Sequence, residues 1–324
     1  YVAPYNAHVV DLLLNEGASI LGRCNMDEFG MGSTTEHSIY GPCLNPWDKE
    51  RVPGGSSGGA AALVAAGVCP IGIGSSTGGS VRQPAAYCGV VGLKPTYGRI
   101  SRRGLVAYAS SLDVVAPIAA SVKDAALALE SMCVPDPLDE TECSPSPVQA
   151  VEAVSKDIEG LRVGILAEGL SEDNAPDINN GILASADALK AAGALVEKVS
   201  IGSLHQALAT YYILAPAEAS SNLSRFDGIR YGPRQAHTDL DSLYTQNRTL
   251  GFGEEVKRRI LMGTYCLSAG YYDAYYRKAL QQQASLRDKL SQIFGSFDLI
   301  LLPTAPDIAP KIGASTDPMK MKLS

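Results

Sequence analysis

The spacing of apolar residues along the chain alternates between a helical and a strand period. Residues 6–17 place Val9, Leu12 and Leu13 on one face, as an amphipathic helix does, and Gly17 predicts the helix end. Helical spacing recurs at residues 60–67, 121–132, the first part of 177–201 and most of 254–294. Strand patterns occur at residues 19–23, 70–74, 89–98, 161–169, the end of 177–201 and 297–306. Strands alternating with helices predict an α/β fold built on a mainly parallel sheet.

The helix at 121–132 also carries a capping signal. Ser121 is expected to be its N-cap, and Asp124 follows three positions later, as the acidic residue of a capping box does. Residues 133–149 are rich in proline and acidic side chains and predict a surface excursion. The strand pattern resumes at residue 161, and no internal repeat is visible.

Composition narrows the possible functions. The 324 residues suffice for one large α/β domain or two small ones, and 46% hydrophobic with 19% charged residues is typical of a globular chain. A net charge of -7 gives no global basic field, so any RNA contact is expected from a partner or from a local patch. No apolar run reaches the roughly 18 residues that a membrane span needs, and the first residues do not match a signal segment.

Metal and disulfide chemistry are not indicated. The cysteines are scattered without a C-x-x-C pair, at Cys24, Cys43, Cys69, Cys88, Cys133, Cys143 and Cys266. This pattern argues against a zinc ribbon or a secreted disulfide framework and is typical of an intracellular protein. The histidines are isolated from one another and from the cysteines, at His8, His37, His205 and His237. Neither a zinc site nor a histidine-based catalytic triad is therefore expected.

Two Gly/Ser loops stand out, at residues 54–59 (GGSSGG) and 75–80 (SSTGGS). Such clusters are commonly turns or linkers. Both loops lie between apolar elements, however, where a rigid loop is expected. Each also offers a hydroxyl that can act as a nucleophile, beside glycines that let other backbone approach closely. Neither contains the Gly-Lys-Ser/Thr ending of a P-loop or the G-x-G-x-x-G of a dinucleotide site, so phosphate binding is disfavoured.

A serine nucleophile needs a base and an oxyanion hole. Successive backbone N–H groups in the segment 77–80 can form such a hole, because its glycines allow the amides to converge. No histidine has a suitable motif nearby. Serine–lysine chemistry is then the remaining option, in which a buried neutral lysine removes the proton through a relay.

The two loops and the residues that follow them resemble the amidase signature family. The stretch GGSSGGAAALVAAG, followed by GSSTGGSVRQPAAYCGVVGLKPTYGRIS, is similar in order and spacing. The resemblance implies an amidase signature fold, with a central mixed, mainly parallel β-sheet covered by helices on both faces. It also implies that Ser80 is the nucleophile and that Ser56 is the relay serine, held through a cis peptide bond. The oxyanion hole would lie at Thr77, Gly78 and Gly79.

Three further stretches narrow the resemblance to the glutaminase components of tRNA-dependent amidotransferases. They are NMDEFGMGSTTEHSIYGPCLNPWD, YYILAPAEASSNLSRFDGIRYG and GFGEEVKRRILMGTYCLSAGYYDAYYRKA. The fatty-acid amide and indole-acetamide branches are not similar here. This resemblance implies a glutaminase of the Ser-Ser-Lys type inside a carbon–nitrogen ligase complex, which releases ammonia from glutamine through an acyl-serine intermediate.

The same resemblance implies the partners. A B subunit would use ATP and Mg to activate glutamyl-tRNA(Gln) or aspartyl-tRNA(Asn) and would bind most of the tRNA, and a small C subunit would complete a heterotrimer. No cofactor is implied for the chain itself, and no membrane. The expected location is the cytoplasm of a prokaryote, a mitochondrion or a chloroplast.

The sequence also departs from the family pattern. Ser76 stands where the family usually has aspartate, so Arg82 is expected to lack a nearby carboxylate. Residues 1–324 are expected to form a single amidase domain, incomplete at both ends relative to the family. The catalytic lysine would precede Tyr1, and an aspartate that holds the amino group of glutamine would follow the last residues. These 324 residues alone are therefore expected to lack glutaminase activity.

The α-carboxylate of glutamine needs a cationic, preferably bidentate partner. The run Lys257-Arg258-Arg259 lies in the stretch that supplies this arginine in the family, and Arg259 is the first choice, with Arg258 the second. The alternative is a solvated basic face. Tyr211 and Tyr212 are expected either to line the same pocket or to belong to the core.

Two other functions fit part of the pattern. One is a non-catalytic amidase-fold scaffold in a larger assembly, which the departure at Ser76 and the expected position of the lysine favour. The other is a general amidase that acts on a small amide. The complete reading frame discriminates the amidotransferase from the scaffold, because an upstream lysine followed by a Gly/Thr-rich segment favours the amidotransferase and its absence favours the scaffold.

Overall fold

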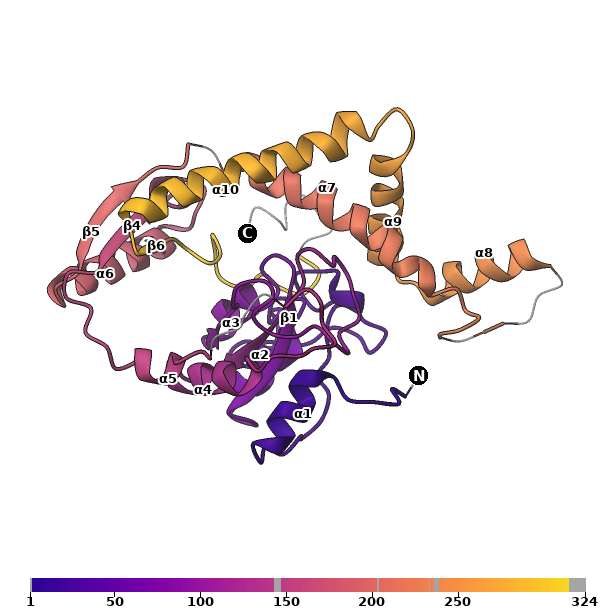
Figure 1. Cartoon of the computed structure of the whole chain (residues 1–324), viewed down its shortest axis with the longest axis horizontal. Coiled ribbons are helices and arrows are strands. Elements are labelled where there is room, and N and C mark those ends of the chain that lie inside the picture. The colour runs from indigo at the N-terminus through magenta and orange to yellow at the C-terminus, as the bar shows by residue number, and fades with distance from the viewer. Residues whose placement is uncertain (1, 143–146, 203, 233, 236–238, 315–324) are drawn as a thin grey trace.

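The computed structural model describes residues 2–142, 147–202, 204–232, 234–235 and 239–314 (Figure 1). The longer helices are α1 (His8–Asn15), α2 (Gly58–Ala65), α3 (Arg82–Cys88), α4 (Val122–Met132), α6 (Pro176–Ala191), α7 (His205–Asn222), α8 (Leu240–Gly251), α9 (Glu254–Leu267) and α10 (Lys278–Ser296). Short helical segments are η1 (Glu28–Gly30), α5 (Ala150–Ala153), η2 (Ala167–Gly169), η3 (Leu223–Arg225) and η4 (Asp273–Arg277). The strands are β1 (Ile71–Ser76), β2 (Val91–Gly92), β3 (Val114–Ala119), β4 (Arg162–Leu166), β5 (Leu195–Val199) and β6 (Leu299–Leu301).

The first sheet has the order β1-β3-β2, and both of its pairings are antiparallel. The central strand, β3, is buried along its whole length, and its side chains alternate between the two faces. Ala116 and Ile118 pack against α2 and α3, whereas Val115 packs on the opposite face against Leu129 of α4. Helices therefore cover both faces of this sheet, as the family resemblance predicted.

The second sheet has the order β5-β4-β6, and both of its pairings are parallel. Leu166 at the end of β4 packs with Ile201 and with Ile293 of α10, the long helix that runs along this sheet (Figure 1). The α/β class is thus confirmed, and parallel pairing is found in this sheet. In place of one continuous sheet, the described residues form two of three strands each, and the sheet that carries the Gly/Ser loops is antiparallel.

Helices α7 and α9 pack closely against each other (Figure 1). Pro216 lies inside α7, and the backbone of Gly263 in α9 approaches its carbonyl so closely that a Cβ at residue 263 would collide with it. A third hydrophobic core joins these helices to the turn after η1, with Met31, Ala215 and Val256 at its centre. The pairing of α7 with α9 therefore brings both helices against the segment that begins at residue 27.

Several predicted elements are confirmed. Helix α1 ends before Gly17, whose φ of 84° suits glycine, and the Ser121 hydroxyl accepts a hydrogen bond from the Asp124 N–H (3.1 Å). The strand predicted at 19–23 is wrong: these residues are exposed and pair with no described strand. A strand is stable only when neighbouring strands satisfy its backbone groups, and apolar spacing alone does not supply them.

Candidate active site

The two Gly/Ser loops lie side by side. The second loop follows β1 and leads into α3, and the first leads into α2. The Ser57 N–H donates to the Ser80 carbonyl (3.1 Å), and the Ser57 hydroxyl donates to the Ser75 carbonyl and accepts from the Ser75 N–H (both 3.2 Å). Gly74 leaves room for this contact, because a Cβ there would lie 2.7 Å from Ser57 Oγ. The segments that carry Ser56 and Ser80 are therefore fixed against each other.

Both predicted catalytic serines are buried, Ser56 at 1% exposure and Ser80 at 7%. The Gly55–Ser56 peptide bond is cis, which confirms the prediction for this position. The Ser56 hydroxyl makes no hydrogen bond with any described residue, so the two serine hydroxyls are not directly bonded. The relay from Ser80 through Ser56 stays a prediction.

In the backbone between β1 and Ser80, carbonyl oxygens accept hydrogen bonds from neighbouring residues, whereas the N–H groups donate to none of the residues that the structure describes. The Gly78 carbonyl accepts from the Ser76 hydroxyl (3.1 Å) and from Arg82 Nη2 (2.5 Å), and the Gly79 carbonyl accepts from the Gln83 N–H (2.9 Å). The N–H groups of residues 77–79 donate to no other described residue. Arg82 is thus bound to a carbonyl that it shares with Ser76, and no described carboxylate pairs with it.

Tyr211 lies against this loop. Its hydroxyl and that of Thr77 are 3.0 Å apart and hydrogen-bonded, and a Cβ at Gly78 would lie 3.3 Å from the Tyr211 ring. Tyr212 packs edge-on against Tyr211, with ring centroids 5.2 Å apart. Helix α7 therefore places a pair of aromatic rings beside the segment that precedes Ser80.

Arg259 of α9 packs against the Tyr212 ring and is 3% exposed. Its Nε donates to Glu255 Oε1 (2.8 Å), and its Nη1 donates to the Tyr108 hydroxyl (2.7 Å). The guanidinium carbon is 5.6 and 5.7 Å from the ring centroids of Tyr108 and Tyr212. Burial lowers the pKa of Arg259, but Tyr108, Tyr211 and Glu255 outweigh it and raise the pKa, so the group is a cation. The interpretation as a solvated face is wrong for this residue.

Arg258 has a different environment. It donates through Nε and Nη2 to both oxygens of Glu255 (2.8 and 2.7 Å) and is partly exposed. It lines a surface hollow of about 550 Å³ together with His37 and Leu261. The two arginines therefore share one carboxylate, but only Arg259 packs against the tyrosines.

Sequence reasoning missed several buried polar residues around the first loop. The carboxylate of Asp27 accepts hydrogen bonds from Thr35 and His37, and Gln83 Oε1 accepts from the Gly55 N–H (3.1 Å). Burial raises the pKa of Asp27 to about 7, although the two N–H groups and the charge of Arg259 act against it. Asp27 and Gln83 lie in long stretches that resemble the family along their whole length, so the resemblance does not single out either side chain. The available signal in the sequence was a polar side chain close to paired glycines.

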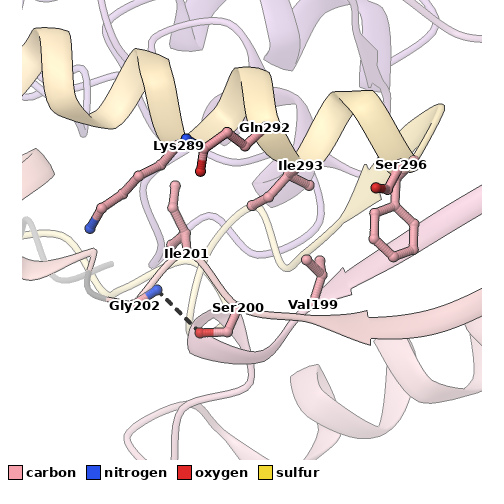
Figure 2. A pocket seen from close by; sticks show the side chains of 9 residues that line it. Val199, Ser200, Ile201, Gly202, Lys289, Gln292, Ile293 and Ser296 are labelled. Carbon is pink, nitrogen blue, oxygen red and sulfur yellow. Dashed lines mark hydrogen bonds between the residues drawn. The ribbon is translucent and has the colours of Figure 1, made fainter.

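A second hollow, of about 530 Å³, lies between the end of β5 and α10. In Figure 2, Lys289 and Ile293 of α10 stand opposite Ser200 and Gly202. Its lining residues include none from the two Gly/Ser loops, so it is separate from the candidate active site. In the described part of the chain, no three His, Cys, Asp or Glu side chains are grouped to hold a metal ion. Cys143 and His237 lie outside the described residues.

No helix among the described residues has the length and apolar character to cross a membrane.

Comparison with known proteins gives a consistent picture. The model of the amidase family matches residues 1–324. The A subunit of glutamyl-tRNA(Gln) amidotransferase from Neisseria gonorrhoeae is 50% identical over 325 residues, which cover 100% of this chain and 68% of that protein. The protein of the same name from Deinococcus radiodurans is 51% identical over 322 residues, which cover 99% of this chain and 66% of that protein.

Solved structures are similar as well. The crystal structure of the A subunit of glutamyl-tRNA(Gln) amidotransferase from Thermotoga maritima superimposes with a TM-score of 0.84 at 42% identity, over 100% of this chain and 66% of that one. A 6-aminohexanoate cyclic dimer hydrolase superimposes with a TM-score of 0.79 at 27% identity, over 97% of this chain and 63% of that one. The chain thus spans about two thirds of the length of these relatives.

Proposed function

Because the chain belongs to the amidase family, we propose that it is the glutaminase component of a tRNA-dependent amidotransferase. The observation that carries the proposal is the junction of the two Gly/Ser loops. In this junction Ser80 lies at the end of a glycine segment, and the N–H of Ser57, the residue after Ser56, donates to the Ser80 carbonyl. The names of the relatives at about half identity point to the same reaction.

The proposed reaction uses groups of this junction together with the lysine that the family resemblance implies. Ser80 Oγ attacks the side-chain carbonyl carbon of glutamine, and its proton passes to Ser56 and on to the lysine of the Ser-Ser-Lys arrangement. The N–H groups of residues 77–79 donate hydrogen bonds to the carbonyl oxygen and stabilise the negative charge that develops on it. Return of the proton to nitrogen breaks the C–N bond, so ammonia leaves and a glutamyl ester remains on Ser80. Water then hydrolyses the ester to glutamate.

Substrate recognition is assigned to α7 and α9. Arg259 offers a buried guanidinium that packs against Tyr212, and a carboxylate is the ligand that such a group binds most strongly. Tyr211, whose ring packs edge-on against Tyr212, contacts the Thr77 hydroxyl and lies against Gly78. Free glutamine carries both a carboxylate for the arginine and a carboxamide for Ser80, which a simple small amide does not.

The ammonia serves a second reaction in this proposal. A B subunit with ATP and Mg activates the acylated tRNA and carries most of the tRNA contacts, and a C subunit completes the assembly. The chain itself needs no cofactor for glutamine hydrolysis. Its net charge of -7 agrees with a component that leaves the nucleic acid to a partner.

The test is a comparison of the complete complex with its Ser80→Ala variant. Loss of a serine nucleophile costs on the order of a millionfold in kcat, so glutamine-dependent ammonia release should vanish. Amidation of the tRNA with ATP and free ammonia should continue, because that step belongs to the partner. Glutaminase activity within tenfold of wild type would refute the role of Ser80.

A further inference from the structure

The backbone of Thr35 adopts an unusual conformation beside the first Gly/Ser loop. Its φ is 58°, in the left-handed region, and the residue is completely buried. A β-branched residue rarely adopts this conformation, because its side chain crowds the backbone. It persists only where the surrounding contacts fix it, and such positions cluster at functional sites.

Asp27 supplies the contacts that hold this turn. Its carboxylate accepts hydrogen bonds from the N–H groups of Thr35 (2.9 Å) and His37 (3.1 Å), and Asp27 itself is completely buried. The N–H of Asp27 donates to the Ser56 carbonyl (3.2 Å). One residue therefore binds both the turn that contains Thr35 and the loop that contains Ser56.

The Thr35 hydroxyl completes the connection. It donates to the Gly54 carbonyl (2.8 Å), with the Ser56 carbonyl at 3.4 Å, and it accepts from the Gly58 N–H (3.1 Å). These partners lie on both sides of Ser56 in the chain. A Cβ at Gly58 would collide with the Thr35 hydroxyl, and a Cβ at Gly55 would collide with the Asp27 carboxylate. The glycines thus let the turn close tightly onto the loop.

The position of the Ser56 hydroxyl must be set by the backbone of the loop that carries it. Ser56 Oγ is buried and bonds to no described residue, so no hydrogen bond of its own sets its place. We propose that Thr35 is a positioning residue for Ser56: its hydroxyl holds the loop so that Ser56 can receive the proton of Ser80, and Asp27 holds Thr35. This inference rests on the proposed glutaminase function, in which Ser56 is the relay.

A matched pair of variants in the complete complex tests the role. Thr35→Val keeps the branched shape but removes the hydroxyl, and Thr35→Ser keeps the hydroxyl. Misplacement of a catalytic group by about 1 Å costs about a hundredfold in rate. Thr35→Val should therefore lower kcat for glutamine hydrolysis at least tenfold with KM changed less than twofold. Thr35→Ser should stay within threefold of wild type in both parameters.

A double-mutant cycle with Ser56→Ala separates positioning from a general structural effect. If Thr35 acts through Ser56, adding Thr35→Val to Ser56→Ala should cause no further loss in single-turnover ammonia release. An equal loss in both backgrounds, or an unchanged kcat in Thr35→Val alone, would overturn the inference while leaving an active wild-type enzyme. A wild-type complex that hydrolyses no glutamine would overturn the proposed function and this inference together.

Discussion

At the scale of single residues, the arginine pair on α9 shows how burial separates neighbours. Arg258 and Arg259 both bond to Glu255, yet only Arg259 is enclosed by Tyr108 and Tyr212. A buried guanidinium costs solvation free energy, which its hydrogen bonds to a carboxylate and a phenol offset in part. Burial at this cost agrees with the substrate-binding role proposed for Arg259.

Substitution by lysine distinguishes the two arginines. Lysine keeps the charge but cannot form the two-pronged contact. Loss of a charge-assisted hydrogen bond costs about 1.5–3 kcal/mol, so Arg259→Lys should raise KM for glutamine by about ten- to a hundredfold. Arg258→Lys, one residue away with the same carboxylate partner, is the control and should change KM less than threefold. A wild-type KM in Arg259→Lys would show that Arg259 has only a structural role.

The two candidate serines could be identified from the sequence, whereas the residues that hold their loops in place could not. Ser56 and Ser80 stand in long ordered motifs whose glycines already indicate close backbone approach. Thr35 and Asp27 act through hydrogen bonds to residues about twenty to thirty positions away. No local pattern encodes such a contact, because it depends on how the turn folds back onto the loop.

At the scale of elements, Asp136 and its partner Arg103 connect segments of the chain that do not pair with one another in a β-sheet. Its carboxylate accepts from the Ser101 hydroxyl (2.7 Å) and from Arg103 Nε (2.8 Å), and Arg103 also contacts His8 at the start of α1 (2.9 Å). Burial raises the pKa of Asp136, but the hydrogen bonds from Ser101 and Arg103 outweigh it and lower the pKa to about 2. The ionised carboxylate therefore stabilises the folded state.

This pKa predicts a pH-dependent contribution to stability. Because the pKa is lower in the folded state than in the unfolded one, the contribution is complete above about pH 4 and is lost as pH falls towards 2. Asp136→Asn should lower the free energy of unfolding at pH 7, and its difference from wild type should shrink between pH 4 and 2. Urea unfolding at several pH values measures this. Asp288→Asn, at an exposed ion pair on α10, is the control and should show little difference at any pH. A constant difference for Asp136→Asn would contradict the assignment.

Apart from the strand predicted at 19–23, elements with clear periodicity were predictable, but β3 and α7, each interrupted by a proline, were not. Strand β3 contains Pro117, which argues against a central strand, yet its carbonyl accepts from the Leu93 N–H (3.1 Å) and the ladder tolerates the missing donor. Helix α7 likewise continues through Pro216, where it packs closely against Gly263 of α9. In both cases tertiary contacts override the local signal.

At the scale of the whole molecule, the candidate site forms where the loop that follows β1 contacts α7, the helix that packs against α9 (Figure 1). Five separate stretches supply it: the turn around Thr35, the two Gly/Ser loops, helix α7 with Tyr211 and helix α9 with Arg259. The second sheet and the hollow beside α10 contribute no residue to these contacts. The fold therefore concentrates the candidate chemistry at one junction.

The central claim is that Ser80 carries the acyl group during glutamine hydrolysis. The direct measurement is acid quenching of the complete complex during turnover of labelled glutamine, followed by proteolysis and mass spectrometry. We expect one glutamyl group on the peptide that contains Ser80, absent from Ser80→Ala and reduced in Ser56→Ala. A glutamyl group on another residue, or steady turnover in Ser80→Ala with no acylated peptide, would contradict it.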